Sequence, residues 1–294
     1  DEIMISYLEH HANIVPWHIA SKKYNFKVVP IEITESGEID YQDFDKKISN
    51  RTKFISLTHM SNVTGSITDF DIINKRIKNM NIPLMIDGCQ FVAHSNVDVS
   101  NLDCDFYVFS GHKLYGPSGV GVLYMKDKWI DDFEPYQGGG DMIDQVNINN
   151  TIYAKGYSKF EAGTPPIAQV IGLGSSIDYV NSLDLNIIFE YEKNLHEYAK
   201  EKLLLLDDIE IYGKSINKGA IISFNIKDFH ANDLAMVLDQ KNIAIRTGHH
   251  CAQPLMKYFN ISASARASFG IYNNTKDVDL FIDALIAAKK FINN

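Results

Sequence analysis

The chain has 294 residues, 45% hydrophobic and 22% charged, which is enough apolar surface for one large or two ordinary domains. Its 28 Lys and Arg against 37 Asp and Glu give a net charge of −9, and without a long basic run this argues against nucleic acid as a partner. No apolar run is long enough to cross a bilayer, so no membrane partner is expected. Three scattered cysteines are too few for a disulfide framework and indicate a reducing compartment.

The first half of the chain alternates short apolar runs with amphipathic segments. Runs rich in Val, Ile and Phe predict strands at 3–6, 26–33, 54–57, 84–86, 106–109 and 121–125. Helices are predicted at 43–48 and at 69–78, where apolar residues recur at helical spacing. Continuous apolar strands that alternate with helices predict a buried, mostly parallel α/β sheet. Because the chain begins at Asp1 and enters a strand almost at once, we expect an upstream part to be missing.

The alternation of predicted strands and helices changes after the Gly138–Gly140 run and the two prolines at 165 and 166. Beyond them, helices are predicted at 168–179, 186–205, 231–240 and 278–291, and strands at 209–212, 221–226, 243–246 and 265–269. Helices and strands in this order predict a smaller α+β domain. We therefore expect a large domain over 1–158 and a small C-terminal domain over 159–294.

Polar side chains follow four of the predicted strands in the first half. The segments are Glu9-His10-His11, Thr58-His59-Met60-Ser61-Asn62, Asp87-Gly88-Cys89-Gln90 and Ser110-Gly111-His112-Lys113. Because open α/β sheets bind ligands at the carboxyl ends of their strands, we expect these side chains to meet at one edge.

Two of these segments carry residues that suit a pyridoxal cofactor. A lysine in the place of Lys113 can lose its proton and form a Schiff base with a carbonyl compound, although most lysines simply reach into water. Asp87 can cap a helix or face a pyridine nitrogen, and Gln90, three residues on, favours pyridoxal phosphate by offering a partner for the phenolic oxygen. Ser110 and His112 beside the lysine can hold a phosphate.

Other residues leave two interpretations open. His10 and His11 suit ring stacking or a metal, but no accompanying ligand motif supports a metal. Cys251, in the loop after a predicted strand and behind two histidines, is a reactive thiolate or a small buried residue. Arg266 lies among small apolar residues and needs a carboxylate, either of a substrate or of a structural ion pair.

Together these segments resemble a known family, the pyridoxal-phosphate-dependent cysteine desulfurases of group II (Suf type), within the class V aminotransferases. The matching segments are the four given above with Leu114-Tyr115-Gly116-Pro117, Gly138-Gly139-Gly140, Phe160-Glu161-Ala162-Gly163-Thr164-Pro165 and Arg246-Thr247-Gly248-His249-His250-Cys251. They span nearly the whole chain in the family's order. The resemblance implies the fold type I of pyridoxal-phosphate-dependent transferases, with a large, mostly parallel α/β domain and a smaller α+β C-terminal domain.

The resemblance also implies how the cofactor is held. Lys113 would bind it covalently and move the substrate Cα proton, while His10 would stack on its ring. Asp87 would pair with the ring nitrogen and Gln90 with the phenolic oxygen. The phosphate would be bound by Ser110, His112 and, from the neighbouring subunit of a homodimer, Thr164.

For the reaction, the resemblance implies that L-cysteine becomes L-alanine with a persulfide on Cys251. Asn62 and Arg266 would hold the substrate carboxylate, and Arg246 would line the site. The persulfide sulfur would pass to an acceptor protein of the SufE or SufU kind for iron–sulfur cluster assembly.

Departures from the family leave alternatives open. Family members carry a further N-terminal segment with a Gly-Thr-Thr phosphate loop that has no counterpart here, so a truncated, non-catalytic, dimerising chain is one alternative. A selenocysteine lyase or cysteine sulfinate desulfinase is another. Cys89 replaces a usual alanine, and Lys159 replaces a usual arginine. The compartment is expected to be the cytoplasm or, alternatively, a plastid or apicoplast stroma.

Overall fold

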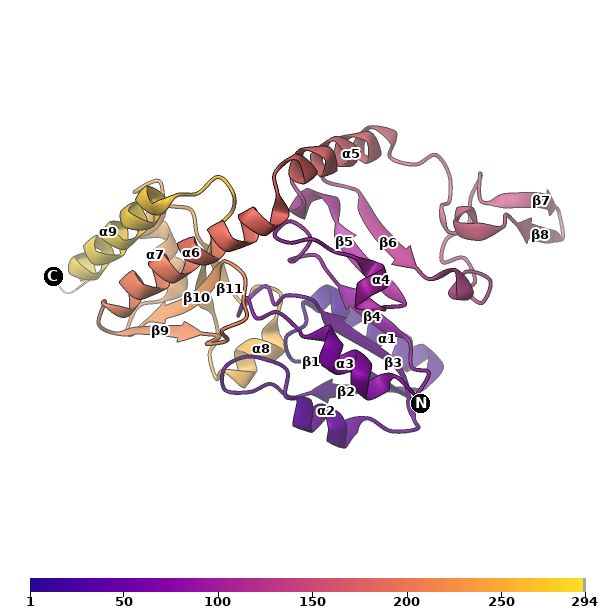
Figure 1. Ribbon diagram of the computed structural model, residues 1–294, viewed down its shortest axis with the longest axis horizontal. Helices are drawn as coiled ribbons and strands as arrows, with labels where there is room; N and C mark the ends of the chain where they lie inside the picture. The colour runs from indigo at the N-terminus through magenta and orange to yellow at the C-terminus, as the bar shows by residue number, and fades with distance from the viewer. Residues whose placement is uncertain (293–294) are drawn as a thin grey trace.

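The first part of the chain forms a six-stranded sheet in the order β2-β1-β3-β4-β5-β6 (Figure 1). The structure is a computed structural model that describes residues 1–292. The first five strands in that order are parallel, and only β6 is antiparallel to its neighbour. The strands are β1 (Glu2–Ser6), β2 (Lys27–Ile31), β3 (Thr52–Thr58), β4 (Leu84–Asp87), β5 (Phe106–Ser110) and β6 (Gly121–Met125). The predicted, mostly parallel sheet is therefore confirmed.

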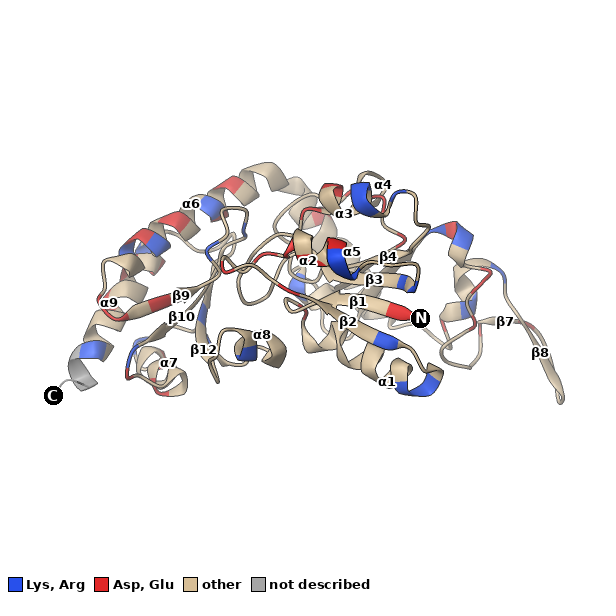
Figure 2. Cartoon of the chain, turned by 90° about the horizontal axis from the view of Figure 1, so that it is seen from below, with Lys and Arg blue, Asp and Glu red and all other residues tan. Residues whose placement is uncertain are grey.

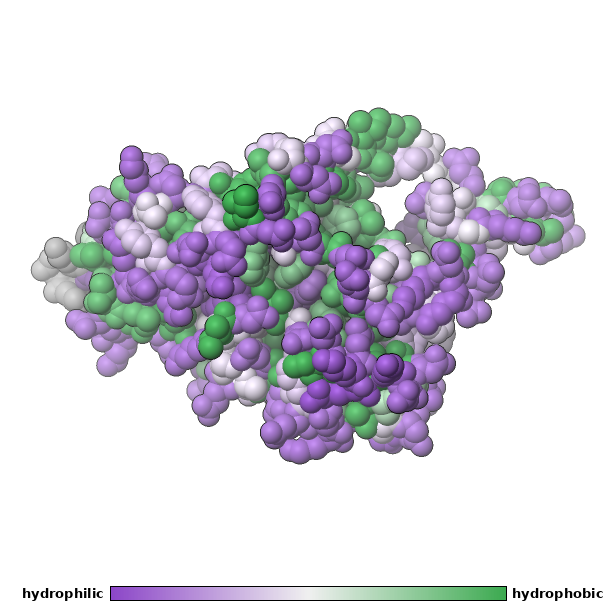
Figure 3. All heavy atoms as spheres, viewed as in Figure 1, coloured by the Kyte–Doolittle hydropathy of each residue, from purple (hydrophilic) through white to green (hydrophobic). Residues whose placement is uncertain are grey.

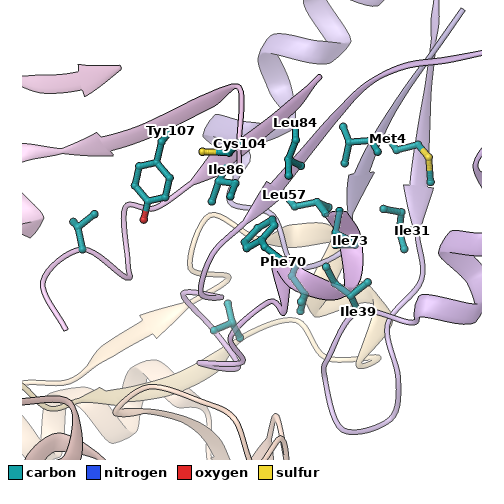
Figure 4. Packing of buried hydrophobic residues seen from close by; sticks show 14 of the residues in the cluster. Met4, Ile31, Ile39, Leu57, Phe70, Ile73, Leu84, Ile86, Cys104 and Tyr107 are labelled. Atoms are coloured by element: carbon teal, nitrogen blue, oxygen red, sulfur yellow. The ribbon is translucent and has the colours of Figure 1, made fainter. Parts of the chain in front are cut away.

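Four helices lie between these strands: α1 (Val15–Tyr24), α2 (Tyr41–Lys47), α3 (Phe70–Ile77) and α4 (Val99–Leu102). In α3, Asp69 caps the first turn by accepting from the N–H of Ile72 at 3.2 Å. Phe70, Ile73 and Ile77 fall on one buried face because they are three and four residues apart. Figure 4 shows Phe70 and Ile73 beside the strand residue Leu57. Burial of each such side chain contributes about 2 kcal/mol.

The C-terminal part contains a second, antiparallel sheet in the order β11-β12-β10-β9. Its strands are β9 (Ile209–Tyr212), β10 (Ile221–Ile226), β11 (Arg246–Gly248) and β12 (Ser264–Ser268). The remaining helices are α5 (Ile167–Ser182), α6 (Leu185–Leu204), α7 (Ala231–Asp239), α8 (Gln253–Tyr258) and α9 (Thr275–Ile292). The strand predicted at 243–246 was placed too early, because the chain joins the sheet only from Arg246 onward.

The two largest hydrophobic cores among the described residues each pack against one of the two sheets. Helix α6 runs from one core to the other (Figure 1). Leu185 and Ile188, in the first turns of α6, belong to the first core, and Leu195 and later residues belong to the second. Leu173 and Val180 of α5 also pack on the first core. The domain division at 158/159 remains a prediction.

A hairpin of β7 (Ile143–Asn147) and β8 (Asn150–Tyr153) extends away from both sheets (Figure 1). The sequence analysis did not predict it, because its alternating residues are mostly polar. On α5, by contrast, the apolar side chains of Ile167, Val170 and Ile171 are exposed, and Figure 3 shows a hydrophobic area over this helix. Acidic and basic residues alternate along α6 (Figure 2). Within residues 1–292, no helix is long and apolar enough to span a membrane.

Candidate active site

A cavity of about 260 Å³ lies at the carboxyl ends of the parallel strands, where the sequence analysis expected a site. Its lining comes from the segments that follow β1, β3, β4 and β5. The lining residues are His10, Ala12, Thr58, Met60, Asn62, Asp87, Cys89, Gln90, Ser110, His112 and Lys113. Seven predicted site residues thus meet in one cavity although they are spread over more than 100 positions.

Several of the cavity's polar side chains have free hydrogen-bonding capacity. Within the described part of the chain, no hydrogen bond or ion pair involves the side chains of Lys113, Gln90 or His112. Asp87 is buried, and its Oδ1 accepts from the N–H of Cys89 at 3.0 Å. An amine, an amide, an imidazole and a buried carboxylate that face one cavity are the donor set that pyridoxal phosphate needs, so the residues present fit this cofactor.

His10 lines the cavity as a half-buried ring held in a fixed orientation. Its Nδ1 accepts from the N–H of Ala12 at 3.1 Å. Burial lowers the pKa of His10, and the positive charge of Lys113 lowers it further. A neutral, oriented imidazole can stack on an aromatic ring without a charge to solvate, which fits the role that the resemblance implies.

Glu9, next to His10, is fully buried, and the sequence analysis gave it no role. Its Oε1 accepts from Ser6 Oγ at 2.5 Å and from the N–H of Thr58 at 3.1 Å, and its Oε2 accepts from Asn13 Nδ2 at 2.6 Å. Burial raises the pKa of Glu9 to about 7, and the nearby charge of Asp87 acts in the same direction. Glu9 therefore ties together the ends of β1 and β3 and the turn that carries His10. An acidic residue three positions after the end of an apolar strand was the available signal.

The segment that carries Cys251 contacts the large sheet through Asn62. The side-chain Nδ2 of Asn62 donates to the carbonyl of His250 at 2.7 Å. His250 is itself buried, and its Nε2 lies 3.0 Å from both the carbonyl oxygen and the Oγ of Ser264. Burial lowers the pKa of His250 to about 4, so this ring is neutral. Cys251, half-buried, thus follows a residue that is fixed to both sheets.

Arg266 and Arg246 are paired across the strands β12 and β11. Burial lowers the pKa of Arg266 to about 10, and the charge of Arg246 contributes, yet Arg266 remains a cation at neutral pH. Its Nη1 donates to the carbonyl of Asn62 at 2.8 Å. The buried Nε of Arg266 and the buried Oδ1 of Asn62 have no partner among the described residues. Unpaired buried polar atoms are costly, so they mark a place where a polar ligand is expected.

Thr164 lies outside the cavity. It is exposed, close to the start of α5, and does not line the space between Lys113 and Asp87. Cys251, Arg246 and Arg266 also do not line the cavity itself. The chain therefore brings the cofactor residues together in one cavity, and Asn62 links that cavity to His250 and Arg266 of the second sheet's region.

A comparison with known proteins decides the family. The family model for class V aminotransferases matches residues 1–281. The chain belongs to the class V aminotransferases, which use pyridoxal phosphate. A probable cysteine desulfurase of Staphylococcus epidermidis is 44% identical over 294 residues, which cover 100% of this chain and 71% of that protein.

Further relatives agree with this. A cysteine desulfurase of Wigglesworthia glossinidia brevipalpis is 44% identical over 99% of this chain and 72% of its own length. The crystal structure of the cysteine desulfurase CsdA from Escherichia coli superposes with a TM-score of 0.95 at 34% identity, over 99% of this chain and 72% of that one. The resemblance to cysteine desulfurases and the expected fold are therefore confirmed, while the Suf-type subgroup remains a prediction.

Proposed function

We propose that this chain binds pyridoxal phosphate and removes sulfur from L-cysteine, with Cys251 as the sulfur-accepting nucleophile. One observation carries the proposal. The cavity combines a lysine that has no hydrogen-bond or ion-pair partner among the described residues with a buried aspartate and an oriented histidine. Asn62, which also lines the cavity, is hydrogen-bonded to the residue before Cys251. Relatedness to cysteine desulfurases along the whole chain supports it.

The cofactor would be held by residues that already face the cavity. Lys113 would bind it covalently, Asp87 would face the ring nitrogen, and His10 would lie against the ring. The other polar partners would be Gln90 for the phenolic oxygen, and Ser110 and His112 for the phosphate. When bound, the cofactor supplies an electron-withdrawing ring that stabilises negative charge at the substrate Cα. Lys113 Nζ would move the Cα proton, since its side chain is otherwise unpaired.

The substrate carboxylate would be bound by Asn62 and Arg266, with Arg246 at the edge of the site. The buried Nε of Arg266 lacks a partner in the described part of the chain, and a carboxylate oxygen would supply one. The Nδ2 of Asn62 already donates a hydrogen bond to the carbonyl of His250. Asn62 would therefore have two roles: it would position Cys251 and also contact the substrate.

The thiolate of Cys251 would then attack the sulfur of the substrate. An S–S bond forms on Cys251 while the substrate Cβ–S bond breaks, and the electron pair of that bond stays with the carbon skeleton. Cβ would take up a proton, Lys113 would return a proton to Cα, and the carbon skeleton would leave as alanine. The persulfide on Cys251 would be removed by a thiol of an acceptor protein of the SufE or SufU kind, for iron–sulfur cluster assembly.

A homodimer is part of the proposal. Exposed apolar side chains lie on α5 (Figure 3), which begins three residues after Thr164, and Thr164 is exposed and does not line the chain's own cavity. Thr164 would therefore serve the neighbouring subunit's phosphate. We also keep as proposals the division into 1–158 and 159–294 and a reducing compartment, the cytoplasm or a plastid stroma.

The test measures alanine and sulfide released from L-cysteine after pyridoxal phosphate is added. We expect Cys251→Ala to lower sulfur release at least about 100-fold, because the nucleophile is lost. Cys104→Ala, which removes a thiol buried in the first core away from the cavity, is the control and should retain release. Unchanged release by Cys251→Ala would disprove the nucleophile assignment. No release by the unmodified chain would favour the truncated, non-catalytic alternative.

Substrate preference is decided by the same assay. Alanine released from cysteine, selenocysteine and cysteine sulfinate is compared at equal concentrations. A rate with cysteine below that with selenocysteine would favour the selenocysteine lyase alternative, and a higher rate with cysteine sulfinate would favour a desulfinase.

A further inference from the structure

The backbone around Cys251 adopts a conformation that needs support. His250 has φ 51° and Cys251 has φ 54°, so two successive residues with side chains are left-handed. L-residues enter this region only at a steric cost, and usually one at a time. Contacts from outside the segment must therefore hold it in place.

His11 provides two of these contacts, one to Cys251 itself and one to Gln253, two residues further on. Its backbone N–H donates to the carbonyl of Cys251 at 2.7 Å, and its side-chain Nε2 accepts from the N–H of Gln253 at 3.0 Å. The Nδ1 of His249 accepts from the N–H of Cys251 at 3.2 Å. The nucleophile segment is thus held by a residue of the short helical turn after β1, which lies 240 positions before Cys251 in the sequence.

The bond from Gln253 fixes the protonation state of His11. An Nε2 that accepts from an N–H carries no proton, so the ring must be neutral with its proton on Nδ1. A protonated ring has no acceptor left, and the contact would turn into a repulsion between two N–H groups. Burial lowers the pKa of His11, and the neighbouring ring of His249, 5.6 Å away, lowers it further.

Among the residues that the structure describes, the lining of the groove beside His11 offers no acid that would favour the charged ring. A groove of about 700 Å³ lies beside it, and none of its lining residues is Asp or Glu. The titratable groups that face His11 are His10 and Tyr7 from its own turn, His18 from α1, His249 from the nucleophile segment, and Lys257 and Tyr258 from α8. The environment therefore favours the neutral, accepting form.

We propose that His11 is a positioning residue for Cys251, whose neutral imidazole clamps the segment from His249 to Gln253 and releases it on protonation. The effect of this clamp on sulfur transfer rests on the proposed function of Cys251 as the nucleophile. The hydrogen bonds that hold the segment do not depend on that function. A held segment keeps the thiol at one place beside the cavity, whereas a released segment lets the thiol leave it.

Hydrogen exchange of the full chain, measured by mass spectrometry without cofactor or substrate, tests the clamp. Exchange in the peptide that contains 249–253 is divided by the chemical exchange rate at each pH. We expect His11→Ala to exchange about tenfold faster there at pH 8, because the amide of Gln253 loses its acceptor. His11→Gln, whose side-chain oxygen can replace Nε2, should restore protection. The exposed neighbour His18 is the control, and His18→Ala should exchange like the unmodified chain.

The pH dependence separates a clamp from a merely structural residue. In the unmodified chain, protection of 249–253 should fall on the acid side of pH 6.5, where His11 gains its proton. In His11→Gln this step should be absent. A step that persists in His11→Gln, or unchanged exchange in a folded His11→Ala, would overturn the proposal. Should His11→Ala not fold, the glutamine variant alone decides. Because neither cofactor nor cysteine is present, failure of the clamp is distinguishable from failure of the desulfurase proposal.

Discussion

The guanidinium of Arg266 donates to the backbone carbonyl of Asn62 at 2.8 Å, although the two residues are 204 positions apart. Arg266 belongs to the small antiparallel sheet, and Asn62 follows a strand of the large parallel sheet. The side chain of Asn62 in turn donates to the carbonyl of His250. The contact therefore couples the position of the nucleophile segment to that of the group proposed to bind the substrate carboxylate.

Arg266→Lys should weaken substrate binding more than it slows the chemical step. A lysine keeps the charge but not the planar fork, so it cannot donate to Asn62 and to a carboxylate in the same way. We expect the KM for cysteine to rise about tenfold or more, with a smaller change in kcat. Arg246→Lys, at the exposed partner position, should have a smaller effect. Steady-state kinetics measure both variants, and equal effects would argue against a special role for Arg266.

Glu9 should make the stability of the chain depend on pH. Burial raises the pKa of Glu9 from 4.5 to about 7. A raised pKa in the folded state means that the stabilising effect of the proton is complete below pH 4.5 and is lost as pH rises towards 7. The loss amounts to about 3 kcal/mol.

Glu9→Gln should remove this dependence because glutamine does not titrate. Denaturant unfolding of both proteins is measured at pH 5 and pH 8. The free energy of unfolding of the unmodified chain should fall by up to about 3 kcal/mol more than that of the variant. Other carboxylates titrate in both proteins, so the difference isolates Glu9. Parallel pH profiles would show that the proton on Glu9 is not linked to folding.

The sequence predicted the strands well because buried parallel strands are continuous apolar runs. It missed α1 and α8 for physical reasons. None of the residues 15–24 is buried, so α1 has no apolar face to show a helical period. Its ends are instead marked by Pro16 near the start and by Asn25, left-handed at φ 54°. The six-residue α8 is too short for a period to be recognised.

The convergence of the cavity residues could also be predicted, since the carboxyl ends of parallel strands share one edge. Long-range contacts of the nucleophile segment could not be predicted from the sequence. Neither the bond between Asn62 and His250 nor that between His11 and Gln253 leaves a local trace in the sequence, because each joins residues that are far apart along the chain. The clamping role of His11 was accessible only from the structure.

Gly88 should tolerate no side chain, because it lies directly against Tyr107. A Cβ added at Gly88 would lie 2.1 Å from the Tyr107 hydroxyl, which is 3.0 Å from Nδ1 of His59. The His59 ring is stacked on Phe91, so the hydroxyl has little room to move. Gly88→Ala should lower the free energy of unfolding by about 1–3 kcal/mol. Gly174→Ala, in α5 with open space around its Cβ, should instead be neutral or stabilise by up to about 1 kcal/mol. The denaturant midpoints of both variants are compared with that of the unmodified chain. A midpoint of Gly88→Ala equal to that of the unmodified chain would contradict the close packing of Gly88 against Tyr107.

Lys113 should be required for the spectrum of the bound cofactor. The amine is half-buried in the cavity and has no ion-pair partner among the described residues, so it is free to react with the aldehyde of pyridoxal phosphate. After the cofactor is added and the excess removed, the unmodified chain should retain a visible absorption band, and Lys113→Ala should not. Lys241→Ala, at an exposed position just after α7, is the matched control and should retain it. A band that survives in Lys113→Ala would mean that another amine reacts. A band absent from the unmodified chain would mean that the cavity residues alone do not retain the cofactor, and Thr164 of a second subunit would be the first contact to examine.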